Sequence, residues 1–208
     1  MTNPSFKTEV LVLGIGNLLW ADEGFGVRAI EAFHQQYEDH PDLRLLDGGT
    51  LGHYLINEVM DAKRILLFDC CDLKAEPGTL KLLRDEDVKI WSTTKISAHQ
   101  TGMNDVLATA TLMGYQPASF SVIAIQPLEL NDYGASLTDA IKAKIPEAIA
   151  MAADELKQWG YTVSKRETNL EDDDFVLSTL SIDRYEKERP SEELAPRDGD
   201  ARYRLRSS

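Results

Sequence analysis

The segment from Val10 to Val27, VLVLGIGNLLWADEGFGV, most constrains the fold of this chain. Its apolar run enters a glycine-rich turn, a pattern typical of a buried central strand in a parallel α/β sheet. Gly14 and Gly16 supply the first two glycines of a dinucleotide-binding G-x-G-x-x-G motif, but a leucine takes the third place. Asp22 and Glu23 then bring carboxylates to a position where a pyrophosphate would require positive potential. We therefore interpret this turn as half of a metal or cation site.

Apolar runs alternate with helical patterns along the following sequence. The expected strands are Val10–Leu13, Leu43–Leu46, Arg64–Phe68, an edge strand at Thr79–Leu83, and Phe120–Ile125. The expected helices cover residues 26–36 and 54–60, a stretch after Gly102, and a long stretch from Ala140 to Trp159, capped by Thr138 and stopped by Gly160. This alternation predicts the α/β class, with a doubly wound, mostly parallel sheet of five or six strands in three αβα layers.

Length and charge divide the chain into two parts. At 208 residues, it is long enough for one domain with a full core, which we place at residues 1–164. Residues 165–208 hold nine Lys/Arg and twelve Asp/Glu with few apolar residues. This composition predicts a disordered or only locally helical tail, and a tail that folds on binding a partner is the alternative.

The whole-chain composition narrows the classes of partner. A net charge of -13 argues against a nucleic-acid partner. The sequence contains neither an apolar run long enough to span a bilayer nor a signal peptide at its N-terminus. Cys70 and Cys71 are adjacent and cannot staple distant segments, so we expect no disulfide framework and a cytoplasmic location.

Polar residues follow several of the expected strands. Glu23 comes after the first strand, Asp47 after the second and Asp69 after the third, while His99 lies in the loop 97–102 before a helix. Because ligands bind beyond the carboxyl ends of the strands in an open α/β sheet, Glu23, Asp69 and His99 are expected to converge. Two carboxylates and an imidazole suit zinc, nickel or manganese, with coordination positions left open for substrate.

Each of these residues also has a structural interpretation. Asp22 suits an N-cap, and Glu23 suits the first turn of a helix, where it favours the macrodipole. Asp47 and Asp69 suit side chains that hold tight turns. The remaining candidates have mainly packing or surface roles: Cys70 and Cys71 at the end of a buried strand, and His34, His40 and His53 without companions at ligand spacing.

The segment Gly14–Arg28 closely resembles the G-x-G-N-x-L-x-x-D-E-x-x-G-V-R signature of the [NiFe]-hydrogenase maturation endopeptidases. Three further blocks match in order, at residues 46–50 (LDGGT), 68–69 (FD) and 95–100 (KISAHQ), and residues 77–86 fit as well. The resemblance covers about residues 8–160, and four ordered blocks make it specific.

This resemblance implies a cytoplasmic, aspartyl-type endopeptidase. Such an enzyme removes a short C-terminal peptide from the precursor of the hydrogenase large subunit after nickel insertion. The family's metal-contacting residues fall on Glu23, Asp69 and His99, and its D-G-G-T aspartate falls on Asp47, which with Gly48 and Gly49 is expected to bind substrate or support the site. The nickel is expected to come with the substrate, and no organic cofactor is implied.

The sequence leaves the mechanism and two other functions open. Nickel held by the precursor acts either as a Lewis acid or as a clamp that positions the scissile bond, and Asp69 or Glu23 is a candidate general base. A nucleotide-dependent enzyme is the second interpretation, which the missing third glycine disfavours. A non-catalytic maturation chaperone that binds nickel or the precursor is the third.

Overall fold

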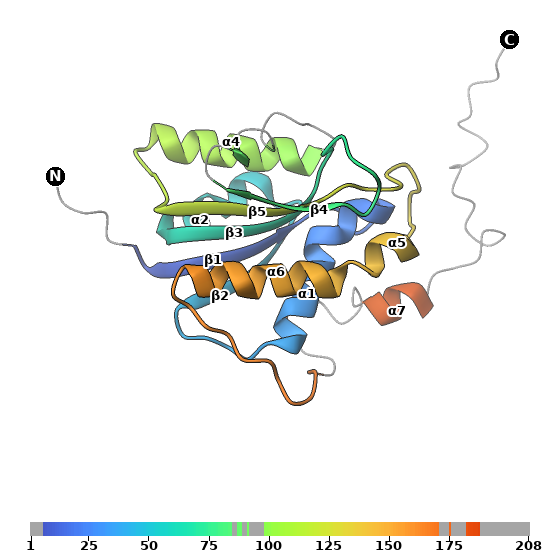
Figure 1. Ribbon diagram of the computed structural model, residues 1–208. Coiled ribbons are helices and arrows are strands. Elements are labelled where there is room, and N and C mark those ends of the chain that lie inside the picture. The colour runs from blue at the N-terminus through green and yellow to red at the C-terminus, as the bar shows by residue number, and fades with distance from the viewer. Residues whose placement is uncertain are drawn as a thin grey trace, which may run out of the picture.

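The computed structural model of the chain describes residues 6–84, 87–88, 91, 98–170, 175 and 182–187. Five strands form one sheet in the order β2-β1-β3-β5-β4 (Figure 1). The strands are β1 (Thr8–Ile15), β2 (Leu43–Gly49), β3 (Ala62–Cys70), β4 (Leu80–Arg84) and β5 (Ser119–Ile125). All neighbours pair in parallel except β4, which lies antiparallel at the edge beside β5. The predicted doubly wound, mostly parallel sheet and its edge strand are confirmed.

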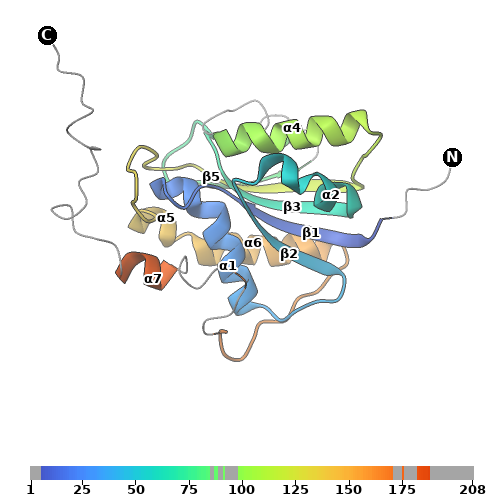
Figure 2. The same cartoon turned by 180° about the vertical axis from the view of Figure 1, so that it is seen from behind.

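Helices cover both faces of this sheet, as Figures 1 and 2 show from opposite sides. One face carries α1 (Phe25–Gln36), α5 (Asp139–Lys142) and α6 (Ile145–Gln158). The other carries the 3-10 helix η2 (Gly52–Leu55), α2 (Ile56–Asp61) and α4 (Ala98–Leu112). The sheet therefore separates two apolar clusters. Val, Leu and Ile side chains of β1 and β3 are buried in both clusters, and this burial stabilises the fold.

The glycines of the first motif allow α1 to lie very close to the sheet. A Cβ on Gly26 would sit 2.2 Å from the carbonyl oxygen of Ile15 and 2.3 Å from that of Phe68. A Cβ on Gly14 would meet the carbonyl oxygen of Gly26 at 2.2 Å. These positions therefore require glycine for helix–strand packing, which accounts for the G-x-G pattern without a nucleotide.

Three details of the expected helices differ in the structure. The long helix over residues 140–159 is divided into α5 and α6, and Pro146 lies in the first turn of α6. Thr138 caps neither helix with its side chain, because its hydroxyl and its backbone N–H both donate to Asp22. His99 lies in α4 and not in a preceding loop, because α4 begins at Ala98.

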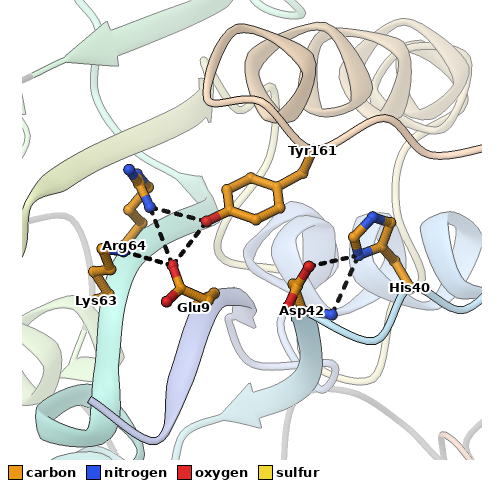
Figure 3. A network of polar contacts seen from close by, with 6 residues as sticks. All are labelled: Glu9, His40, Asp42, Lys63, Arg64 and Tyr161. Atoms are coloured by element: carbon orange, nitrogen blue, oxygen red, sulfur yellow. Dashed lines mark hydrogen bonds and ion pairs between the residues drawn. The ribbon is translucent and has the colours of Figure 1, made fainter. Parts of the chain in front are cut away.

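The amino ends of the strands carry a polar cluster far from the site described below (Figure 3). The Glu9 carboxylate accepts hydrogen bonds from Lys63 at 2.8 Å and from the Tyr161 hydroxyl at 2.9 Å. Arg64 donates to the same hydroxyl at 2.9 Å. Tyr161 follows α6, so the cluster attaches the end of the last domain helix to β1 and β3.

Described residues beyond position 164 also contact the domain. Lys165 forms an isolated bridge with Tyr37, and the backbone N–H of Arg166 donates to the Gln36 carbonyl at 2.8 Å. The short helix α7 (Ile182–Lys187) lies next to α5 in both views (Figures 1 and 2). The domain boundary after residue 164 stays a prediction. Within the described part of the chain, no helix has the length and apolar character needed to cross a membrane.

Candidate functional site

The candidate site lies at the carboxyl ends of β1 and β3. The chain passes from β1 to β2 on one side of β1, then crosses to β3 on the other side. This reversal makes the carboxyl edge between β1 and β3 the switch point at which open α/β sheets bind ligands. Phe68 pairs with Gly14 in the register of β3 and β1, so Asp69 follows directly beside the end of β1.

Asp22 holds two loops together. Its fully buried carboxylate accepts hydrogen bonds from the backbone N–H groups of Leu128, Glu129 and Thr138 at 3.0, 2.9 and 2.7 Å. The Thr138 hydroxyl adds a fourth at 3.2 Å. Asp22 is therefore neither an N-cap nor half of an open cation site, because both of its oxygens bind protein donors that fasten the acidic loop to the β5–α5 loop.

Glu23 follows in the same 3-10 turn, η1 (Ala21–Gly24), and is half-buried. Its backbone is packed so closely that a Cβ on Gly16 would lie 2.0 Å from the Glu23 carbonyl oxygen. The preceding Ala21 has a φ of 40°, a left-handed conformation that costs free energy in a non-glycine residue. Close packing and a strained backbone therefore fix the conformation of the turn that carries the Glu23 side chain.

Asp69 is fully buried near the end of β3. Its Oδ1 accepts a hydrogen bond from the Cys70 backbone N–H at 2.8 Å, and its Oδ2 accepts one from the Trp91 indole N–H at 2.7 Å. Two donors on different oxygens fix the rotation of the carboxylate. Trp91 is not among the residues that the sequence singles out. The signal available for it is general: the indole N–H of a buried tryptophan needs a hydrogen-bond acceptor.

Asp47 lies on the opposite face of the sheet from Asp69. It is the β2 partner of Gly14, whose β3 partner Phe68 packs in the apolar cluster of α1 and α6. Asp69, one residue further on, points to the other face. The Asp47 Oδ1 accepts a hydrogen bond from the Gly49 N–H at 2.9 Å, so the structural expectation of a tight turn is confirmed. Burial raises the pKa of Asp47, against the lowering effects of that bond and of the Arg28 charge.

The backbone of α4 reaches the same edge. A Cβ on Gly102 would lie 3.3 Å from the Gly52 Cα, so the first turns of α4 pack against the segment that follows the 47–49 turn. His99 is the second residue of this helix, which brings its backbone near the carboxyl edge. The imidazole of His99 lies outside the described side chains, and its approach to Glu23 and Asp69 stays a prediction.

The pKa of the Cys70 thiol depends on the acidic side chains near the end of β3. Burial raises its pKa well above the ordinary value, and the charges of Asp69, Asp22 and Glu23 raise it further. The end of β3 therefore lies within electrostatic reach of these carboxylates, in keeping with the backbone contact between η1 and β3. Cys70 and Cys71 are buried free thiols, in agreement with their expected packing role.

This arrangement can hold an incoming cation but is incomplete by itself. Among the residues whose side chains are described, no group of three or more His, Cys, Asp or Glu side chains is arranged to hold a metal ion. Asp22, Asp47 and Asp69 all accept hydrogen bonds from protein donors, and Glu23 lies in the turn that contacts β3. Binding of a metal by Glu23 and Asp69 stays a prediction.

The fold is a doubly wound α/β sheet with acidic residues at its switch point, and comparison with known proteins specifies the class. A family model described as hydrogenase maturation protease matches residues 27–155. The Rhodobacter capsulatus hydrogenase expression/formation protein HupD is 49% identical over 202 residues, covering 96% of this chain and 95% of that protein. The Escherichia coli hydrogenase 2 maturation protease is 35% identical over 159 residues, covering 76% and 96%.

A solved structure agrees. The hydrogenase maturating endopeptidase HybD of E. coli matches with a TM-score of 0.72 and 34% identity, over 76% of this chain and 98% of that one. This chain belongs to the hydrogenase maturation protease family. The predicted α/β fold, the family resemblance and the peptidase class are therefore confirmed.

Proposed function

We propose that this chain removes a short C-terminal peptide from the nickel-loaded precursor of a [NiFe]-hydrogenase large subunit. Membership of the hydrogenase maturation protease family supports an endopeptidase acting in hydrogenase maturation. The observation that carries the nickel-dependent form of this proposal is the Asp69 carboxylate. It is fully buried at the switch point, oriented by Trp91, and close enough to the acidic loop for both to act on Cys70.

In this proposal the nickel is part of the substrate. Glu23, Asp69 and His99 contact the metal held in the precursor, which fixes the scissile bond over the crevice. The protein supplies an incomplete set of ligands, so only a metal already bound by the precursor is held firmly. A precursor without nickel lacks this anchor, and cleavage is thereby restricted to precursor that has received its metal. No organic cofactor takes part.

The chemical step then requires a water molecule directed at the scissile carbonyl. Asp69 or Glu23 takes a proton from that water as general base, or the nickel polarises the carbonyl while the carboxylates hold it. The hydrogen bonds to Asp69 fix the direction of its carboxylate, which suits either role. Asp47, Gly48 and Gly49 form a turn on the other face of the sheet edge, where we place a substrate-binding or supporting role.

The proposal places the enzyme in the cytoplasm, where an unprocessed precursor would be met. Its test is an incubation of the purified protein with the large-subunit precursor of its own host, with and without inserted nickel, read by intact mass. Loss of a C-terminal peptide from the nickel-loaded form alone supports the proposal. Cleavage of both forms contradicts the metal check, and tight binding without any cleavage indicates a chaperone.

A further inference from the structure

Described tail residues contact one side of α1. The Leu170 backbone N–H donates to the Gln35 carbonyl, and Phe175 stacks on His34. Further along, the Ile182 backbone hydrogen-bonds Glu31, and the Tyr185 ring faces Arg28. His34, Glu31 and Arg28 are spaced three residues apart and therefore share one helix face, and Gln35 is next to His34. These contacts extend from the C-terminal end of α1 to its first turn, where α7 lies.

Two kinds of contact hold α7 in place. The Glu186 carboxylate accepts hydrogen bonds from the Ser136 hydroxyl at 2.7 Å and from the Lys142 ammonium group. Tyr185 lines a small cavity together with Arg28 and residues of the acidic loop, among them Ala21 and Gly24. Helix α7 thus connects three parts of the domain: the start of α1, the acidic loop and the segment leading into α5.

The centre of this contact is a buried charge. The Arg28 guanidinium has a side-chain exposure of 3% and donates to the Glu31 carboxylate at 2.9 Å. The guanidinium carbon of Arg28 lies 5.8 Å from the centre of the Tyr185 ring, within the range of a cation–π interaction. The ring of Tyr185 therefore helps to keep water from the ion pair and limits the positions that the guanidinium can take.

Arg28 in turn lies near the turn of Asp47. Gly14 is the register partner of Asp47, and the N-terminal turn of α1 packs directly on Gly14 through Gly26. The Arg28 charge lowers the pKa of Asp47, while the Asp47 charge raises that of Glu31. The guanidinium is hydrogen-bonded to Glu31, and its charge also reaches the Asp47 carboxylate.

We propose that α7 is a positioning element for the substrate-binding turn, in which Tyr185 holds the Arg28 guanidinium where its charge acts on Asp47. The inference rests on the proposed function, because it gives the 47–49 turn a role in binding the precursor.

The test compares the full-length protein with its Tyr185→Ala and Tyr185→Phe variants. The first readout is hydrogen exchange of the Gly49 amide, whose bond to Asp47 reports the integrity of the turn and needs no substrate. The second is KM and kcat for nickel-loaded precursor. We expect Tyr185→Ala to speed Gly49 exchange and raise KM by about fivefold, with kcat within about twofold, as loss of one cation–π contact implies. Tyr185→Phe keeps the ring and should match the wild type.

A second pair of variants separates docking of α7 from loss of any surface ion pair. Glu186→Gln removes the negative charge that pairs with Lys142, and Glu147→Gln in α6 removes that of a comparable exposed pair with Lys144. Only Glu186→Gln should change Gly49 exchange and KM. Unchanged exchange in Tyr185→Ala, or faster exchange with an unchanged KM, overturns the inference. Failure of the wild type to cleave overturns the proposed function instead, and exchange still decides the role of α7.

Discussion

The indole N–H of Trp91 donates a hydrogen bond to Oδ2 of Asp69 at 2.7 Å, and both side chains are fully buried. The bond crosses from a residue after β4 to the end of β3, so the orientation of the carboxylate depends on a segment distant in sequence. A buried carboxylate with a fixed direction is useful for holding a metal or a water, since little rearrangement is then needed during reaction.

Replacing Trp91 with Phe should therefore loosen Asp69 without removing it. We expect the loss of one hydrogen bond to a charged acceptor to cost about 1–3 kcal/mol of unfolding free energy. Single-turnover cleavage of nickel-loaded precursor should slow by about tenfold or more, because the carboxylate no longer keeps one direction. Trp159→Phe is the matched control, as that indole lies at the end of α6. Equal cleavage rates in the two variants would show that Trp91 does not position Asp69.

Asp22 and Glu23 are adjacent acids with opposite expected behaviour. Asp22→Asn removes acceptor capacity from a buried carboxylate with four donors, so the free energy of unfolding should fall by about 2–4 kcal/mol. Glu23→Gln should change it by less than about 1 kcal/mol and yet abolish cleavage. Urea unfolding and intact mass of the precursor measure the two effects. A stable, inactive Asp22→Asn protein would contradict this division of roles.

Gly26 should tolerate no side chain. Its Cβ would approach two carbonyl oxygens, of Ile15 and Phe68, at 2.2 and 2.3 Å, and neither backbone can give way without disturbing β1 or β3. We expect Gly26→Ala to cost about 3 kcal/mol or more, by analogy with overpacked cores. Ala32→Gly in the same helix serves as the control and should cost about 1 kcal/mol. Comparable midpoints of thermal unfolding for both variants would contradict the close packing of α1.

Stability should depend on pH through Glu155. Its buried carboxylate is desolvated, which raises its pKa, but hydrogen bonds from Arg84 and then Ser121 outweigh that effect and the net pKa is lowered from 4.5. A lowered pKa in the folded state stabilises the fold above pH 4.5, and this contribution is lost as the pH falls through the folded-state pKa.

Arg84→Ala should therefore flatten the acid limb of the stability curve. The variant should lose about 2–3 kcal/mol at neutral pH, because the Glu155 carboxylate then keeps the Ser121 hydroxyl but loses its charged partner, and it should lose less in acid. The measurement is the free energy of unfolding in urea from pH 7 to pH 3 for the wild type and the variant. The difference between the two proteins cancels the opposing contributions of Glu31 and Asp47, whose pKa values are raised. A constant difference across that range would show that the ion pair does not set the pH dependence.

The apolar strands of this fold could be predicted from the sequence because burial on both faces leaves a continuous apolar run. Thus β1 and β5 lie where the sequence places them, with ends extended by one or two residues. The division of residues 140–159 into two helices could not be predicted in this way. The break lies at Ala143 and Lys144, directly before Pro146 in the first turn of α6, and the apolar periodicity alone does not show it.

The candidate site shows the same limit. The sequence predicts that Glu23 and Asp69 share one edge, since strand ends in a parallel sheet share an edge, and η1 lies against β3 in the structure. The sequence could not assign Asp22 to the loop contacts, because its partners lie more than a hundred residues away. Nor could it identify Trp91, whose acceptor Asp69 is 22 positions away in the sequence.

The central claim is that Glu23, Asp69 and His99 hold the nickel of the precursor. The most direct measurement is equilibrium binding of nickel-loaded and nickel-free precursor to the wild type and to Glu23→Gln, Asp69→Asn and His99→Ala. Tyr161→Phe, in the cluster at the amino edge, is the control. We predict a wild-type and control preference for loaded precursor of about tenfold or more, reduced in each site variant, with unchanged binding of nickel-free precursor. An equal preference in all five proteins would contradict the account.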